Sequence, residues 1–159
     1  MSEDEGQRAR EAAFRLLAVR ARSAQELRQR LKRKGFPQEI VDQVIADLQA
    51  KGYQNDAEFA RQFAREKWSG SGWGPARISQ ELRAKGISPG LVSTVVEETF
   101  GEVDLVAAIL PRAGKRWENM RDLPRETRRR RLSGFLRRRG YDWETLGKVI
   151  VQLENDEIP

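Results

Sequence analysis

A block of residues around three glycines, repeated along the chain, constrains the fold most strongly. The glycines are Gly35, Gly86 and Gly140, which lie 51 and 54 residues apart. A basic residue precedes each glycine, and an apolar or aromatic residue follows it. Apolar residues recur at fixed positions on both sides. They are Leu27, Leu31, Val41, Val44 and Ile45 in the first block, Ile78, Leu82, Val92, Val95 and Val96 in the second, and Leu132, Leu136, Leu146, Val149 and Ile150 in the third.

This spacing predicts a helix, a glycine stop and a second helix in each block. Apolar residues three and four positions apart share one face of a helix. A basic residue in the last turn complements the negative end of the helix, and glycine adopts the left-handed conformation that closes it. Pro37, Pro89 and Asp142 suit the start of the following helix, because proline is tolerated in a first turn and aspartate caps one.

A preceding helix is expected to complete each block as a three-helix repeat. In the first repeat it covers about residues 7–21, and Ser23 and Glu26 then form a capping box for the next helix. In the second repeat the helix opens at Asp56, which is suited to be its N-cap, and ends before a flexible turn at residues 69–72.

The third repeat is expected to differ in its first helix. That helix covers residues 103–113 with an interruption at Pro111, and a long connection through Trp117 leads to a helix near residues 126–139. The sequence therefore predicts an all-α fold of three tandem three-helix repeats in an elongated, curved arrangement. A count of two helices per repeat, with the first helices as linkers, remains open. The predicted repeats are 1–54, 55–102 and 103–159.

The composition argues against catalysis and against bound metals or cofactors. The chain has no histidine and no cysteine, so the commonest general base, the commonest metal ligand and all thiolate chemistry are missing. Residues 70–74 are glycine-rich, but no strand precedes them and no phosphate-loop motif is present, so we interpret them as a turn. We expect a cytoplasmic protein without a membrane segment, because no apolar run approaches the length of a span. We predict no enzyme activity, no cofactor and no metal site.

Basic residues are the strongest candidates for partner contacts. The net charge of +6 is concentrated in the first and third repeats, while the second is close to neutral. With Leu132 and Leu136 on the buried face of a helix, Arg130, Arg131, Arg137 and Arg138 fall on the opposite face. Such a stripe suits a polyanion or an acidic protein surface, although a purely solubilising face is the alternative. The candidate partner- or DNA-binding residues are Arg28, Lys32, Arg33, Arg128, Arg130, Arg131, Arg137 and Arg138.

The four tryptophans are expected to serve mainly as anchors of small cores. They are Trp68, Trp73, Trp117 and Trp143. Trp73 is the expected exception, because it stands in the glycine-rich segment.

An ordered set of short motifs resembles the RecX family of regulators of the RecA recombinase. The family pattern is close to R-x-R-S-x-x-E-L and L-x-x-K-G, then G-Y-x-x-D-x-x-F/Y-A and a second L-x-x-K-G. The resemblance covers roughly residues 9–153, and its third repeat is the least diagnostic. The matching residues are Arg20, Arg22, Ser23, Glu26, Leu27, Leu31, Lys34, Gly35, Gly52, Tyr53, Asp56, Phe59, Ala60, Gly74, Leu82, Lys85, Gly86 and Ile87.

The resemblance implies a cytoplasmic, all-helical protein with a role in recombination, DNA repair and the SOS response. We expect the chain to be a monomer. It implies binding to the RecA–DNA filament, with inhibition of RecA ATPase and strand exchange, and possible contact with single- or double-stranded DNA. Two alternatives remain open at this point. One is a non-specific DNA-binding helical protein, and the other is a helical-repeat scaffold for an unrelated partner.

Overall fold

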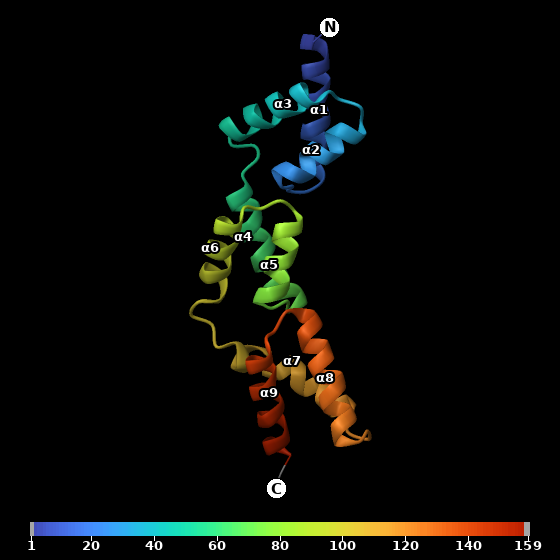
Figure 1. The fold of residues 1–159 in the computed structure, drawn as a ribbon, viewed down its shortest axis with the longest axis vertical. Coiled ribbons are helices and arrows are strands. Elements are labelled where there is room, and N and C mark those ends of the chain that lie inside the picture. The colour runs from blue at the N-terminus through green and yellow to red at the C-terminus, as the bar shows by residue number, and fades with distance from the viewer. Residues whose placement is uncertain (1, 158–159) are drawn as a thin grey trace. The chain divides into compact units, whose positions relative to one another are not determined.

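Residues 2–157, which the computed structural model describes, form helices joined by short turns, and this part of the chain contains no strand (Figure 1). This confirms the predicted all-α class, and the described part contains nine α-helices and one π-helical turn, labelled η1. The elements are α1 Ser2–Val19, α2 Ala24–Arg33, α3 Gln38–Ala50, α4 Asp56–Glu66, η1 Lys67–Ser71, α5 Pro75–Ala84, α6 Pro89–Phe100, α7 Leu105–Asn119, α8 Arg125–Arg139 and α9 Trp143–Asp156.

The helices form two compact units. The first comprises Met1–Phe63 and Glu81–Val95, and the second comprises Ala64–Gln80 and Val96–Pro159. Helices α4, α5 and α6 therefore contribute residues to both units. The division into repeats at 54/55 and 102/103 and the elongated, curved arrangement stay predictions.

The first unit is built on a core of α1, α2 and α3. Leu27, Leu31, Val41 and Ile45 are fully buried in it, and Leu48 is 1% exposed. These residues come from the first glycine block and its continuation, so the apolar periodicity of the sequence accounts directly for this core.

The second unit is built on a core of α7, α8 and α9, with Trp117 as its largest side chain. Here the expectation that the first helix ends near residue 113 is wrong, because α7 continues through Pro111 to Asn119. Ile109, Ala113 and Trp117 lie four residues apart on one face and are all buried. Burial of this continuous apolar face outweighs the loss of one backbone hydrogen bond at the exposed Pro111.

The three glycines of the repeated block close their helices as predicted. Gly35, Gly86 and Gly140 have φ values of +94°, +80° and +101°. After each glycine, the next amide donates back to the leucine four residues before that glycine, as in the bond from Tyr141 N to Leu136 O at 3.1 Å. This is the hydrogen bond of a Schellman motif, which requires a left-handed residue at the helix end.

The segment expected as a flexible turn after α4 is instead an ordered π-helical turn, η1, which ends at Gly72 with φ +67°. Its carbonyl groups receive hydrogen bonds from distant side chains of the second unit. Arg112 donates to Ser69 O, Arg139 donates to Ser71 O at 2.6 Å, and the Tyr141 hydroxyl donates to Gly72 O at 2.7 Å. These donors satisfy carbonyls that a flexible loop leaves to solvent.

Candidate partner-binding surface on helix α8

Helix α8 carries the densest group of arginines in the chain, and two leucines set its buried face. Leu132 and Leu136 are 0% and 2% exposed within the core of the second unit. The helix begins after Pro124 and ends at Gly140. With the leucines inward, the helical period divides the arginines between a face toward α9 and an outer face.

The arginines on the inner side pair with carboxylates at the end of α9. Arg129 Nη2 donates to Glu154 Oε2 at 2.7 Å, and Arg125 Nη2 lies 3.5 Å from the same oxygen. Glu154 is only 7% exposed, and the hydrogen bond from Arg129 lowers the pKa of its carboxyl group. The ionised carboxylate therefore helps to hold α8 against α9.

Arg128, one of the predicted partner-binding residues, lies inside the second unit. It is 6% exposed, and its Nη2 donates to Trp117 O at 2.9 Å and to Glu157 Oε1 at 2.7 Å. Its guanidinium also lies 3.9 Å from the centroid of the Trp117 ring. Arg128 is buried because it stands four residues before Leu132 and so shares the buried face of the helix. Arg128 therefore has a structural role and is not part of the exposed arginine surface of α8.

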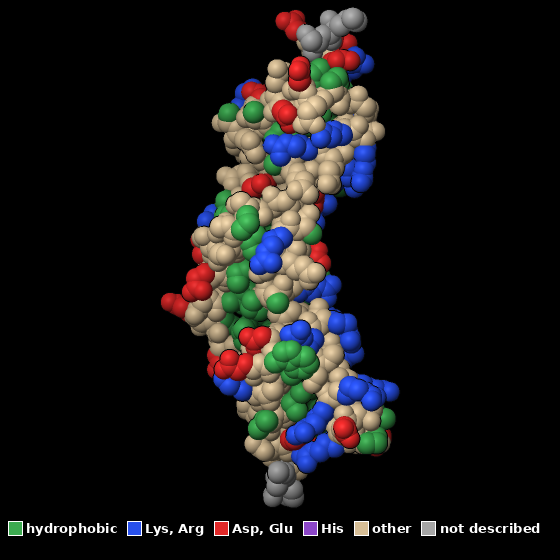
Figure 2. Space-filling model, viewed as in Figure 1, with side chains coloured by type: hydrophobic (Ala, Val, Ile, Leu, Met, Phe, Trp, Pro, Cys, Tyr) green, Lys and Arg blue, Asp and Glu red, His purple; other side chains and the backbone are tan. Residues whose placement is uncertain are grey.

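The outer face carries four exposed guanidinium groups without ion-pair partners. We call Arg130, Arg131, Arg137 and Arg138 the α8 arginine surface. Within the described residues none of the four forms an ion pair, in contrast to the inner arginines. Lys and Arg side chains gather over α8 in Figure 2. Because like charges on one face repel, an anionic partner gains more here than at a surface whose charges are already paired.

Trp143, the first residue of α9, extends this surface with an exposed aromatic ring. It is 64% exposed, and the Arg137 guanidinium lies 4.6 Å from the centroid of its ring. The sequence indicated Trp73 as the exposed tryptophan, but Trp73 is partly buried, with Arg77 lying 3.9 Å from its ring centroid. Trp117 is in the core as expected, and Trp68 is partly buried with its ring edge-on to Phe100.

The basic candidates of the first unit are less uniform. Arg28 forms an ion pair with Asp42 at 3.5 Å, so part of its charge is compensated. Lys32 and Arg33 are exposed near the end of α2 and form no ion pair with the described residues. These two side chains remain available for a partner.

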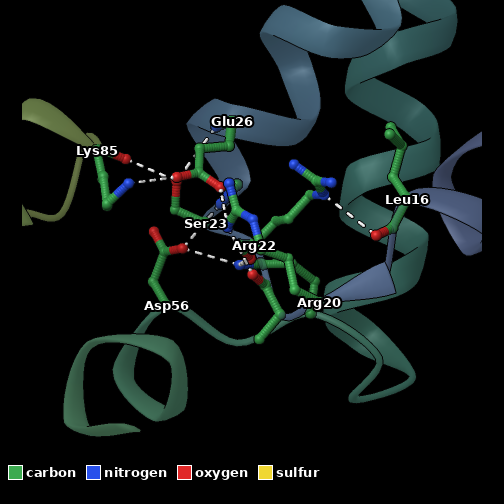
Figure 3. A network of polar contacts seen from close by, with 10 residues as sticks. Leu16, Arg20, Arg22, Ser23, Glu26, Asp56 and Lys85 are labelled. Carbon is green, nitrogen blue, oxygen red and sulfur yellow. Dashed lines mark hydrogen bonds and ion pairs between the residues drawn. The ribbon is translucent and has the colours of Figure 1, made fainter. Parts of the chain in front are cut away.

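A polar network in the first unit joins the start of α2 to the start of α4 (Figure 3). Asp56 Oδ1 accepts hydrogen bonds from Ala24 N at 2.9 Å and from Gln54 Nε2 at 2.8 Å. The expectation that Asp56 caps its own helix is therefore wrong. Asn55 has that role through a bond from Glu58 N at 3.1 Å, so Asp56 is free to bind the first turn of α2.

The same network also joins α2 to the end of α5. Ser23 Oγ accepts from Glu26 N, which confirms Ser23 as a helix cap, and donates to Lys85 O at 2.7 Å. Glu26 binds Lys85 Nζ at 2.8 Å and Arg20 Nη1 at 3.0 Å. Burial alone raises the pKa of Glu26, but Lys85 and Arg20 together hold that pKa below its ordinary value. Arg22 is buried nearby and donates to Leu16 O at 3.1 Å. These motif residues hold the unit together.

Residues 2–157 contain no group of three or more Asp, Glu, His or Cys side chains placed to hold a metal ion. Over the same residues, no helix has the length and apolar character needed to cross a membrane.

The described residues form two cores, each built on three helices, and helix α8 of the second core carries the exposed α8 arginine surface. These features define an all-α protein built from three-helix domains. Two family models match the chain, described as "RecX, first three-helix domain" over residues 9–48 and "RecX, second three-helix domain" over residues 55–96. The chain belongs to the RecX family of regulatory proteins.

Curated relatives and solved structures agree with this assignment. The regulatory protein RecX of Amycolatopsis mediterranei (strain U-32) is 38% identical over 144 residues, which cover 87% of this chain and 79% of the relative. That of Legionella pneumophila (strain Corby) is 32% identical over 148 residues, covering 93% and 96%. The crystal structure of RecX from Lactobacillus salivarius has the same fold, with a TM-score of 0.83 at 18% identity, and covers 96% of this chain and 99% of that chain.

Proposed function

We propose that the chain binds the RecA–DNA filament and inhibits RecA ATPase and strand exchange. The observation that carries this proposal is the match of both RecX domain models to consecutive parts of the chain. In this proposal the protein acts as a cytoplasmic monomer and catalyses no reaction itself.

The α8 arginine surface is the proposed contact region. Its guanidinium groups are exposed and form no ion pair among the described residues, whereas Arg125, Arg128 and Arg129 pair with Glu154 and Glu157 and Arg139 donates to Ser71 O. A nucleoprotein filament presents phosphates and acidic side chains, and a guanidinium forms bidentate hydrogen bonds with either group. Lys32 and Arg33 of α2 are proposed as further contacts on the same chemical ground.

The test is DNA-dependent ATP hydrolysis by RecA in the presence of wild-type or variant chain. The variant replaces Arg130, Arg131, Arg137 and Arg138 with Glu. We expect weaker inhibition and a flatter salt dependence, because exposed charge contacts are screened by salt. Circular dichroism is expected to be unchanged, because these side chains are exposed. Absence of inhibition by the wild-type chain would refute the function, whatever the variant does.

A matched control separates a specific surface from general charge. It replaces four exposed basic residues outside the α8 arginine surface, with the same total change of charge, and is expected to inhibit nearly as well as the wild type. Equal loss in both variants would remove the α8 arginine surface from the mechanism. The control residues are Arg30, Arg65, Arg83 and Lys115.

Binding of single-stranded DNA by the same surface is a second candidate, favoured by Trp143. An exposed ring beside exposed arginines is the combination that binds unpaired bases by stacking and phosphates by charge. Trp143→Ala distinguishes the candidates. It is expected to weaken binding to a naked oligonucleotide clearly if bases stack on the ring, and to leave inhibition of the filament almost unchanged if RecA side chains are the contact.

A further inference from the structure

The start of α2 packs on the glycine-closed end of α5 within the first unit. Ser23 Oγ donates to Lys85 O at 2.7 Å, and Gln25 Nε2 donates to Ala84 O at 3.4 Å. A Cβ atom on Gly86 would lie only 2.0 Å from Gln25 Oε1, so the incoming helix occupies the space beside this glycine. The carbonyls one and two positions before the glycine are therefore bound by the first turn of another helix.

The start of α5 packs in the same way on the glycine-closed end of α8 within the second unit. Gly74 N donates to Arg139 O at 2.6 Å, and Arg77 Nη1 donates to Arg138 O at 3.1 Å. A Cβ atom on Gly140 would lie 2.4 Å from Arg77 N. Again the carbonyls one and two positions before the glycine accept the bonds.

These two junctions share a register as well as a geometry. Ser23 and Gly74 each stand twelve residues before the glycine of their own repeat, and each binds the carbonyl just before the next glycine. The residue after the receiving glycine is buried in both cases, with Ile87 and Tyr141 each 3% exposed. In both junctions the glycine-closed helix end of the repeated block therefore receives the first turn of another helix, because the negative end of the one attracts the positive end of the other.

The third such end, at Gly35 of α2, is empty. A Cβ atom on Gly35 would meet no atom within 4 Å. The Arg33 and Lys34 carbonyls, which correspond to the accepting carbonyls of the filled junctions, receive no hydrogen bond from the described residues. Phe36, which corresponds to the buried Ile87 and Tyr141, is only partly buried.

The third repeat offers no equivalent helix start for this site. The residue twelve positions before Gly140 is Arg128, which lies inside α8 and is fixed by Trp117 O and Glu157. The first turn of α8 is thus shifted away from the register that the two filled junctions use.

We propose that the Gly35 end of α2 is a docking site for the first turn of a helix of a separate partner protein. The partner is expected to begin that helix with Ser, Thr or Gly and to carry Glu three residues later. The reason is charge complementarity at Lys34. Lys34 corresponds to Lys85, which binds Glu26 at 2.8 Å in the filled junction, and Lys34 forms no ion pair with the described residues. This site does not involve the α8 arginine surface, but it adjoins Lys32 and Arg33, which are further contacts in the proposed function.

The chain itself supplies a probe for this site. A lactam-stabilised helical peptide with the sequence of residues 21–33 carries the Ser23 cap and Glu26. Titrated into the full-length, ¹⁵N-labelled chain, it is expected to shift the amide signals of Lys34, Gly35 and Phe36. A peptide with Glu26→Lys is expected to bind about fivefold more weakly, the upper range for an exposed ion pair. The Lys34→Glu chain is expected to restore its binding.

Gly35→Asn is the blocking variant. Asparagine tolerates the left-handed conformation, and its side chain enters the space that the partner helix needs. We expect the peptide to cause no shifts at residues 34–36 in this variant. The charge exchange at Lys34 tests the site independently, even if Gly35→Asn unfolds.

Three outcomes would overturn the proposal. The first is the absence of shifts at residues 34–36 at millimolar peptide. The second is a set of shifts around Gly86, which would mean that the peptide displaces the chain's own α2. The third is self-association of the chain alone that Gly35→Asn abolishes, which would identify the occupant as a second copy of this chain.

Discussion

Replacement of the three glycines of the repeated block, Gly35, Gly86 and Gly140, by alanine is expected to give a graded loss of stability. At Gly35 only the backbone is affected, because φ is +94° and a Cβ atom meets no neighbour within 4 Å. The left-handed conformation costs an L-residue about 1–2 kcal/mol. We therefore expect Gly35→Ala to lower the free energy of unfolding by about 1–2 kcal/mol.

At Gly140 a collision adds to the same backbone cost. The new Cβ atom would lie 2.4 Å from Arg77 N, which is backbone and cannot rotate away. The start of α5 must then move, which breaks the bonds from Gly74 N to Arg139 O, from Ala76 N to Gly140 O and from Arg77 to Arg138 O. At about 1 kcal/mol each, these bonds bring the total for Gly140→Ala to about 4–5 kcal/mol.

Gly86→Ala should fall between the two, because its Cβ atom meets the side chain of Gln25 and not a backbone atom. The assay is urea unfolding of the full chain, followed by circular dichroism at matched protein concentration. Equal losses for Gly35→Ala and Gly140→Ala would refute the distinction between an empty and a filled helix end.

Three further predictions concern the second unit. The pKa of Glu154 is lowered from 4.5 in the folded chain, so its contribution to stability is present above that value and is lost as the pH falls through the lower folded value. The Glu154→Gln variant is expected to be less stable than the wild type at pH 7 and to lose less stability on acidification. Urea midpoints at pH 7 and pH 3 measure both effects. Arg128→Met is expected to lower the free energy of unfolding by about 2 kcal/mol, since it removes the hydrogen bonds that Arg128 donates to Trp117 O and to Glu157. Arg130→Met should change the free energy of unfolding by less than about 0.5 kcal/mol. Equal effects of the two variants in thermal unfolding would contradict the placement of Arg128 inside the unit and of Arg130 on its surface. Trp143→Phe is expected to remove most of the change in tryptophan fluorescence on filament binding, because Trp143 is the most exposed tryptophan of the described residues at 64%. An unchanged fluorescence signal would place the contact elsewhere on the chain.

The periodic parts of the fold could be predicted from the sequence. Helices around Gly35, Gly86 and Gly140 follow from apolar residues at helical spacing and from a residue type that tolerates positive φ. The error at Pro111 arose because local propensity argues for a break, while the buried face from Ile109 to Trp117 is a tertiary effect.

The candidate surface was predicted in part. The helical period identified Arg130, Arg131, Arg137 and Arg138 as outward residues, and they are exposed. The period also contained the information on Arg128, four residues before Leu132, but a charged residue is not expected in a core unless its partners are known. Those partners, Trp117 O and Glu157, lie 11 and 29 residues away in sequence and could not be derived from the arginine pattern.

The most direct test of the proposed function is equilibrium binding of the labelled chain to three targets at one salt concentration. These are RecA filaments assembled on single-stranded DNA, the same DNA alone, and free RecA. We predict that the wild-type chain binds the filament more tightly than either component. We also predict that replacement of Arg130, Arg131, Arg137 and Arg138 by Glu weakens filament binding more than the control at Arg30, Arg65, Arg83 and Lys115 does. Equal affinity for filament and naked DNA, with both lost in the first variant, would contradict filament regulation and support plain DNA binding.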